Sequence, residues 1–298
     1  MILLSGSSNI SLAQKIAEHL GQPLGSIESS TFANGERRVW VKEEVKGKDV
    51  ALIQSFSEPV DAHIIEFSLI VDALFRLGAR RVFAVIPWFG YSLQDKSFRP
   101  GEPIAAKVIA TMLGSLSIYR YILLNLHNNS SAGFFQNPTS VLSSDSVFEQ
   151  EIKALGKDTV LVSSDFGGLK KVGLFSQRLN LPFANIDKRR DLVTGQVLAH
   201  SISGDVENKT AVILDDIINS GSTAIEAARI AREHGAKKIL MLATHALLAG
   251  DASQRLQESE IDEVIVTDTV DSSAKRFPKL RVLSISHLIA DELAQWSK

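Results

Sequence analysis

The stretch VILDDIINSGST, residues 212–223, places two adjacent carboxylates, Asp215 and Asp216, directly after an apolar run. Small and hydroxyl-bearing residues follow, and a periodic segment, TAIEAARIAREHG, begins at Thr223. The apolar run predicts a buried strand over residues 211–214, and the periodic segment predicts a helix that ends at Gly235. Strand, turn and helix in this order form the repeating unit of a parallel α/β sheet.

The same alternation recurs along the rest of the chain. Short apolar runs predict strands at residues 2–4, 50–54, 81–86, 121–126, 159–162, 211–214, 238–243, 263–266 and 281–284. Between two of them, residues 61–78 form a helical pattern with one apolar face, made by Ile64, Phe67, Ile70, Val71 and Leu74. The sequence therefore predicts an α/β protein whose mainly parallel sheets are flanked by helices.

The length of 298 residues suggests about two domains. No low-complexity linker divides the chain. The segment of residues 134–144 has no strong period and predicts a loop, after which a new helix and strand begin. We therefore expect one α/β domain over residues 1–143 and a second over residues 144–298, with ligands beyond the carboxyl ends of the strands.

The composition excludes several classes of protein. The formal net charge of −2 argues against a broad surface for nucleic acid. No apolar stretch is long enough to predict a membrane span, and the first ten residues lack the pattern of a secretory signal. The chain has no cysteine, so it has neither disulfides nor thiolate metal sites. We expect a cytoplasmic protein.

The turn after the acid pair favours an anionic ligand. The start of a helix offers free backbone N–H groups and a positive dipole end. Gly221 allows close approach of the backbone, and the hydroxyls of Ser220, Ser222 and Thr223 add donors. A sugar phosphate would satisfy both halves of the motif, because its vicinal hydroxyls suit the two carboxylates. The alternative is an ordinary strand end and helix cap without a ligand.

The whole stretch resembles the phosphoribosyl diphosphate motif of the type I phosphoribosyltransferases. This resemblance implies that Asp215 and Asp216 bind ribose hydroxyls. It also implies that the loop holds a 5-phosphate, through Asn219, Ser220, Gly221, Ser222 and Thr223.

Six further motifs, in order, resemble the signatures of the ribose-phosphate pyrophosphokinases. They are FANGE at residues 32–36, VIPWFGYSLQDK at 85–96, GEPIAAK at 101–107, LNLH at 124–127, SSDFGG at 163–168 and DKRR at 187–190. The resemblance implies two tandem type I phosphoribosyltransferase-like domains, the first binding the nucleotide and the second binding ribose 5-phosphate. It implies transfer of the diphosphoryl group of ATP to the anomeric hydroxyl of ribose 5-phosphate.

The resemblance also assigns roles to single residues. Lys188 and Arg190 are expected to be catalytic, at the start of a mobile segment that extends to about residue 203; a surface strand or hairpin is the alternative. His127 and Asp165 are expected on the metal side of the site, with Mg²⁺ bridging the ATP phosphates. The nucleotide is expected to bind through Phe32, Asn34, Glu36 and Gln94. In the family a neighbouring subunit supplies the FANGE loop, which implies a homo-oligomer with its active site at a subunit interface.

Three residues inside these motifs depart from the family pattern. Asn34 and Asn125 stand where aspartate is usual, and Leu93 stands where arginine is usual. Each change removes a charge, and Leu93 puts the choice of nucleotide donor in question. The departures keep two alternatives open, a catalytically weak regulatory homologue and a nucleobase phosphoribosyltransferase.

Overall fold

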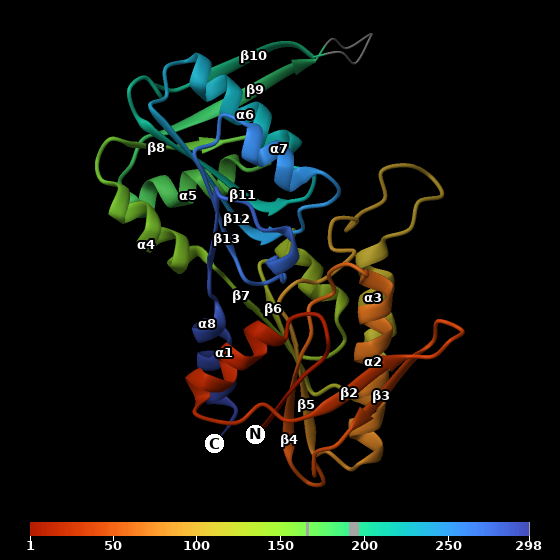
Figure 1. The fold of residues 1–298 in the computed structure, drawn as a ribbon. Helices are drawn as coiled ribbons and strands as arrows, with labels where there is room; N and C mark the ends of the chain where they lie inside the picture. The colour runs from red at the N-terminus through yellow and green to blue at the C-terminus, as the bar shows by residue number, and fades with distance from the viewer. Residues whose placement is uncertain (165–166, 191–196, 298) are drawn as a thin grey trace. The chain divides into compact units, whose positions relative to one another are not determined.

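The structure is a computed structural model, and it describes residues 1–164, 167–190 and 197–297. The chain divides into two compact units (Figure 1). Unit 1 consists of residues 1–144 and 269–271 together with the residues from Ser284 onward. Unit 2 consists of residues 145–268 and 272–283.

Unit 1 contains a five-stranded parallel sheet with helices on both faces (Figure 1). Its strands, in spatial order, are β1 (Ile2–Ser5), β4 (Asp49–Ile53), β5 (Arg81–Ile86), β6 (Arg120–Leu124) and β7 (Thr139–Leu142). One face carries α1 (Ile10–Leu20) and α8 (Ser286–Gln295), and the other carries α2 (Val60–Arg76) and α3 (Ala105–Gly114). A separate antiparallel hairpin, β2 (Ile27–Thr31) and β3 (Arg37–Val41), packs beside α2. A 3₁₀ helix, η1 (Asn129–Phe134), follows β6.

Unit 2 contains a seven-stranded sheet. Its strands, in spatial order, are β10 (Val197–Ser203), β9 (Phe183–Arg190), β8 (Thr159–Ser163), β11 (Thr210–Ile218), β12 (Lys238–Ala246), β13 (Glu263–Thr267) and β14 (Leu280–Leu283). All neighbours are parallel except β9 and β10. One face packs on α4 (Asp145–Leu155) and α5 (Leu169–Leu179), and the other packs on α6 (Ser222–Glu233) and α7 (Ala252–Glu258). A single 3₁₀ turn, η2 (Ser273–Lys275), precedes β14.

Strand β11 illustrates why buried strands of such sheets are apolar throughout. Val212 and Leu214 belong to the core beneath α4 and α5, whereas Ala211 and Ile213 belong to the core beneath α6 and α7. Successive side chains of a strand point to opposite faces, and both faces here are covered by helices. The alternation of polar and apolar residues that marks a half-exposed strand is therefore absent.

The α/β class and all nine predicted strands are confirmed, and so is the helix over residues 61–78, whose five apolar residues are buried in α2. The prediction of an irregular loop over residues 134–144 is wrong, because it contains the edge strand β7. The strands β2, β3 and β9 were also not predicted, and β10 matches only the alternative of a surface strand or hairpin in the segment up to residue 203. β11 continues past Leu214 to Ile218, since β12 pairs with it along that length.

The division of the chain differs from the expected one at its end. We expected residues 144–298 to form one domain, but the segment from Ser284 onward belongs to unit 1. Helix α8 packs along α1, and the Trp296 ring lies 6.2 Å from that of Phe83. Ile289 and Leu293 of α8 are buried as a result, so this apolar face completes the core of the first unit.

The start of β4 carries a nearly buried ion pair. The Asp49 side chain is 7% exposed and accepts hydrogen bonds from Arg80 Nη2 and Arg81 Nη2, each at 2.5 Å. These two guanidinium groups hold the pKa of the Asp49 carboxyl well below its usual range. Arg81 also stacks on the ring of Tyr119, at 5.0 Å. The cluster fastens neighbouring strands β4 and β5 at their amino ends.

We predict that Asp49→Asn lowers the free energy of unfolding by about 1–3 kcal/mol at pH 7, because hydrogen bonds between charged groups are lost. A carboxyl whose pKa is depressed by folding stabilises the protein above its unfolded pKa, for which 3.8 is the reference value, and this stabilisation disappears as the pH falls through the lower folded value. The difference between the two proteins in urea unfolding should therefore shrink below about pH 4.

The matched control is Asp72→Asn, since Asp72 forms an ion pair with Arg76 but its side chain is 51% exposed. This variant should change stability little at any pH. A difference between wild type and Asp49→Asn that stays constant from pH 7 to pH 3 would contradict the assigned cause.

Candidate active site

The acid pair lies where the direction of strand order reverses in unit 2. From β8 the chain continues through α5 to β9 on one side, and from β11 it continues through α6 to β12 on the other side. α5 and α6 cover opposite faces, so the carboxyl ends of β8 and β11 border an open crevice. Pairing of β11 with β8 ends at Leu214 and Ser163, just before Asp215.

A small cavity lies at this point, and its lining contains most of the predicted substrate residues. Its volume is ≈ 110 Å³, and it is lined by Asp215, Ile217, Ile218, Asn219, Ser220, Gly221, Ser222, Thr223 and Ala224. They belong to the end of β11, the connecting turn of residues 219–221 and the start of α6. The structure therefore brings Asp215 and the five loop residues together around one space, while Asp216 lies at its margin.

The loop has the backbone geometry expected of an anion site. Gly221 has a φ of 74°, in the left-handed region, and precedes the first residue of α6 without any side-chain cap. The first N–H groups of a helix have no partner within it, so those of α6 are available to a ligand. The Ser220 and Ser222 hydroxyl oxygens lie 3.2 Å apart beside them. Together these groups are donors suited to a phosphate.

Lys171 of α5, which the sequence did not lead us to predict, contacts the acid pair. Its Nζ donates to Asp216 Oδ1 at 2.6 Å and to the carbonyl oxygen of Asp215 at 3.1 Å. The Lys171 side chain is 18% exposed and that of Asp216 is 32% exposed. This cation offsets part of the negative charge beside the anion-binding loop. A signal existed in the sequence, since two lysines follow the SSDFGG motif at the start of a helix.

Arg255 of α7 is a second cation that the sequence did not indicate. Its Nη1 donates to the carbonyl oxygen of Ser220 at 3.2 Å, and its Nη2 donates to Ser222 Oγ at 3.0 Å. Nothing in the local pattern distinguishes it from other partly exposed helix arginines. Only the folding of α7 against the loop reveals the contact.

The DKRR motif lies on β9, next to β8. The last residue of β8, Ser163, pairs with Asn185, and β9 continues to Arg190. The backbone of Lys188 and Arg190 therefore extends beyond the carboxyl end of β8, the same edge at which the acid pair lies. β9 pairs with β10 in an antiparallel hairpin, which corresponds to the hairpin alternative. Asp165 lies outside the described residues.

The FANGE motif forms the tip of the β2–β3 hairpin in unit 1. Phe32 N donates to the Glu36 carbonyl oxygen at 2.8 Å, and Gly35 N donates to that of Phe32 at 2.8 Å. Asn34 Oδ1 accepts from Glu36 N at 3.2 Å. The amide oxygen thus fills the turn-forming role that an aspartate would fill. The Phe32 side chain is 51% exposed, which leaves its ring available for stacking.

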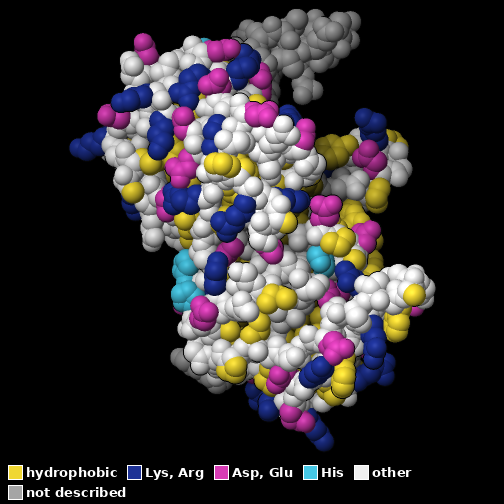
Figure 2. All heavy atoms as spheres, in the orientation of Figure 1, with side chains coloured by type: hydrophobic (Ala, Val, Ile, Leu, Met, Phe, Trp, Pro, Cys, Tyr) yellow, Lys and Arg dark blue, Asp and Glu magenta, His cyan; other side chains and the backbone are white. Residues whose placement is uncertain are grey.

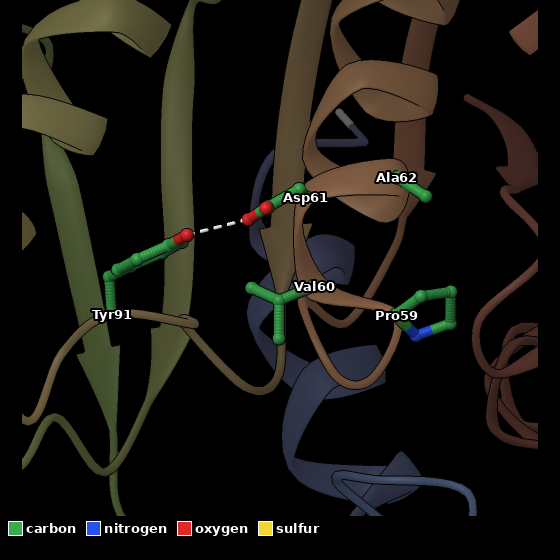
Figure 3. Close-up of a pocket in the computed structure, with 5 residues that line it drawn as sticks. All are labelled: Pro59, Val60, Asp61, Ala62 and Tyr91. Carbon is green, nitrogen blue, oxygen red and sulfur yellow. Dashed lines mark hydrogen bonds between the residues drawn. The ribbon is translucent and has the colours of Figure 1, made fainter. Parts of the chain in front are cut away.

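The YSLQDK segment follows β5 and is held by its neighbours. The Gln94 carbonyl oxygen accepts from Ala106 N at 3.1 Å, at the start of α3. Tyr91, which has a φ of 67°, donates its hydroxyl to Asp61 Oδ1 at 2.6 Å, and this bond raises the pKa of the phenol (Figure 3). Leu93 is 41% exposed, and no contact explains its replacement of the usual arginine.

Figure 3 shows the hollow beside this bond, at the start of α2. Its volume is ≈ 620 Å³, and it is lined by Pro59, Val60, Asp61, Ala62 and Tyr91. A second hollow of ≈ 470 Å³ shares Asp61 and Ala62 with the first and is also lined by Gly35 and Glu36 of the hairpin tip. Within the described chain, no hydrogen bond or ring contact joins Phe32 or Glu36 to Gln94. Asp61 and Ala62 line both hollows, so residues of the two predicted nucleotide motifs border neighbouring hollows without a direct hydrogen bond among the described residues.

His127 follows β6 and is exposed. Asn125 has a φ of 40°, which asparagine tolerates better than most residues, and its Oδ1 accepts from Ser144 N at 2.7 Å. Asn128 Nδ2 donates to Asp95 Oδ2 at 2.7 Å. The LNLH and YSLQDK loops are therefore brought together. Among the described residues, no group of three or more His, Asp or Glu side chains is placed to hold a metal ion.

Comparison with known proteins extends these observations. A family model described as the N-terminal domain of ribose phosphate pyrophosphokinase matches residues 1–116, and one described as the phosphoribosyl synthetase-associated domain matches residues 192–296. A ribose-phosphate pyrophosphokinase of Caldanaerobacter subterraneus subsp. tengcongensis is 37% identical over 295 residues, which cover 98% of this chain and 93% of the relative. One of Burkholderia pseudomallei is 37% identical over 300 residues, covering 99% and 94%.

The solved structures give the same result. The crystal structure of phosphoribosylpyrophosphate synthetase from Mycobacterium smegmatis aligns with a TM-score of 0.92 at 34% identity, covering 99% of this chain and 98% of that one. The helix-flanked parallel sheets and the small-residue turn at the switch point define a two-unit α/β protein with the fold of that synthetase. Within that class, the chain belongs to the ribose-phosphate pyrophosphokinase family, as its motifs predicted.

Proposed function

We propose that this protein transfers the diphosphoryl group of ATP to the anomeric hydroxyl of ribose 5-phosphate, giving phosphoribosyl diphosphate and AMP. The observation that carries this proposal is the cavity that unites Asp215 with the loop of residues 219–223, in a chain that matches pyrophosphokinase relatives over almost its full length. The comparisons offer no support for a regulatory homologue. We also propose a cytoplasmic location, since ATP and phosphorylated sugars do not cross membranes freely. None of the described helices meets the length and apolarity required to span a membrane.

In this proposal each part of the unit 2 site has a distinct task. The N–H groups and hydroxyls at the start of α6 hold the 5-phosphate, and Asp215 and Asp216 accept hydrogen bonds from the ribose hydroxyls. Unit 2 would thus supply the sugar side of the reaction, and unit 1 the nucleotide side. Fixing the sugar at both ends aims its anomeric oxygen at the phosphorus under attack, which is the main requirement of phosphoryl transfer.

Lys188 and Arg190 are proposed to stabilise the charge that develops on the transferring group. Their support is their motif and the position of β9, which extends past the carboxyl edge of β8. A guanidinium group binds two phosphate oxygens in a fork, whereas an ammonium group acts as a point charge.

A magnesium ion is proposed to accompany ATP. Mg²⁺ keeps several waters and needs only one or two protein ligands when phosphates complete its shell. The exposed imidazole of His127, on a loop fastened through Asn125 and Asn128, is available for this role. Asp165 would be the second ligand. When bound, the ion neutralises charge on the ATP phosphates.

The FANGE hairpin is proposed to reach the nucleotide site of a neighbouring subunit in a homo-oligomer. Phe32, with Asn34 and Glu36 beside it, would then meet Gln94 of another copy. Trp40 on the same hairpin is 56% exposed, and Lys42 Nζ lies 4.9 Å from its ring. Figure 2 shows apolar and basic side chains together on the surface over this hairpin. Exposed aromatic side chains such as Phe32 and Trp40 are typical of an interface.

The first prediction concerns catalysis. Lys188→Ala and Arg190→Ala should each lower kcat by about 10²-fold or more, with smaller changes in KM, because the lost interaction belongs to the transition state. The measurement is AMP formation from ATP, magnesium and ribose 5-phosphate. Near-normal kcat in both variants would reject the assignment, and no AMP from the wild-type protein would reject the proposed function.

The second prediction concerns the phosphate loop. Thr223→Ala should weaken binding of ribose 5-phosphate by about tenfold, the effect of one hydrogen bond to a charged group, while leaving binding of ribose unchanged. Calorimetric titration with each sugar measures both effects. Ser253→Ala, which removes a hydroxyl of α7 that donates to the Lys275 carbonyl oxygen, is the control and should alter neither affinity. Equal weakening for the two sugars would show that the loop does not hold the phosphate.

The third prediction concerns the subunit interface. If Phe32 of one subunit and Arg190 of another serve the same site, mixing the inactive variants Phe32→Ala and Arg190→Ala creates some sites with both native residues. Random pairing about a two-fold axis should restore about a quarter of the wild-type activity. Each variant refolded alone is the control. Mixed oligomers without any recovered activity would mean that each subunit supplies its own Phe32.

A further inference from the structure

The backbone of residues 218–221 carries carbonyl oxygens as well as N–H groups, and these oxygens must be kept away from a bound anion. A peptide chain that presents N–H groups to an anion must keep its carbonyl oxygens elsewhere, because their partial negative charge repels the anion. Each carbonyl of residues 218–221 therefore needs a donor outside the cavity. The structure provides one for every carbonyl, from two different sources.

Three of the four carbonyls are held by backbone N–H groups. Ile218 O accepts from Leu247 N at 2.9 Å and from Leu248 N at 3.1 Å, and Asn219 O accepts from Ala249 N at 3.0 Å. Gly221 O accepts from Ile225 N at 2.9 Å as α6 begins. These bonds depend on the path of the chain and not on the identity of a side chain, so most substitutions would preserve them.

The carbonyl of Ser220 is different, because a side chain holds it. Arg255 Nη1 donates to this oxygen at 3.2 Å, and Arg255 Nη2 donates to Ser222 Oγ at 3.0 Å. Arg255 is not part of the cavity lining. Among the described residues Arg255 forms no ion pair with a carboxylate. Its guanidinium group donates two hydrogen bonds to the loop, at Ser220 and Ser222.

The second hydrogen bond sets the polarity of the Ser222 hydroxyl. A guanidinium group has only donors, so Ser222 Oγ must accept from it. The single proton of this hydroxyl is then free to point to the Ser220 hydroxyl or, when an anion is bound, into the cavity. Arg255 thus favours the donor orientation that an anion requires.

The conformational freedom of Gly221 makes a restraint on the Ser220 carbonyl necessary. Its φ of 74° lies in a region that glycine enters freely, and glycine tolerates the alternative orientation of the preceding peptide as well. A Cβ at this position would lie 3.3 Å from the side chain of Leu256, so α7 leaves little space behind the loop. Without Arg255, the peptide between Ser220 and Gly221 could turn its carbonyl toward the anion and withdraw the Gly221 N–H.

We propose that Arg255 is a positioning residue for the 5-phosphate: it anchors the Ser220 carbonyl away from the cavity and orients the Ser222 hydroxyl as a donor. The proposal rests on the proposed function, since it assumes that ribose 5-phosphate occupies the loop. It assigns Arg255 no contact with the substrate. Its effect should appear in affinity for the phosphorylated sugar and not in affinity for ATP or ribose.

The test is calorimetric titration of ribose 5-phosphate and of ribose into wild type, Arg255→Ala and Arg255→Lys. The alanine variant should bind ribose 5-phosphate about tenfold more weakly, equivalent to ~1.4 kcal/mol, and bind ribose as wild type does. Lysine keeps the charge but cannot hold two acceptors in a fork, so its affinity should lie closer to that of alanine. If the alanine variant does not fold, the lysine variant provides the measurement.

The control is Arg229→Ala, because Arg229 is a partly exposed arginine of α6 whose ion pairs among the described residues are with Glu226 and Glu233 of its own helix. It should leave both affinities unchanged. Normal ribose 5-phosphate binding by Arg255→Ala, or complete rescue by lysine, overturns the positioning role while leaving the proposed function intact. A wild-type protein that does not bind ribose 5-phosphate overturns the proposed function, and this role with it.

Discussion

The carboxyl ends of β8 and β11 lie side by side, and the chain leaves them in opposite directions. This single topological constraint decides where a ligand can bind. Because the crossovers are right-handed, helices cover one face while the strand order runs in one direction and the other face once it reverses. Here α5 and α6 cover opposite faces, so the ends of the two strands stay open. The acid pair, the phosphate loop and the end of β9 all lie at this one edge.

Placing carboxylates beside the proposed phosphate loop is electrostatically unfavourable, and the fold compensates with cations from outside the motif. Lys171 approaches the acid pair from α5, and Arg255 approaches the loop from α7. These helices cover opposite faces of the sheet. The two cations therefore lie around the site, and Asp215 is the charged residue in the lining of the cavity itself.

The sequence was most informative where a signal is local. Fully buried strands such as β11 and β12 are continuous apolar runs, and the phosphate loop is contiguous with its helix, so both could be predicted. β7 is a half-buried edge strand, and the polar residues of β2 hide its pairing with β3. These strands depend on neighbours that are distant in sequence. The same is true of the contacts of Lys171 and Arg255, whose residue types are ordinary for helix surfaces.

Helix α8 lies near the carboxyl end of the described chain but packs on α1 of unit 1, and this affects the order in which the protein folds. Ile289, Leu293 and Trp296 complete a core to which residues 1–144 contribute the rest. A ribosome delivers the polypeptide from its amino end, and domains usually fold in that order. The face of α1 that packs on α8 cannot be buried until α8 has been synthesised. The sheet of unit 2, in contrast, is complete once β14 has emerged from the ribosome. Unit 1 is therefore the first to be synthesised but the last to complete its core. Until α8 emerges, the apolar face of α1 that α8 covers stays exposed on the nascent chain.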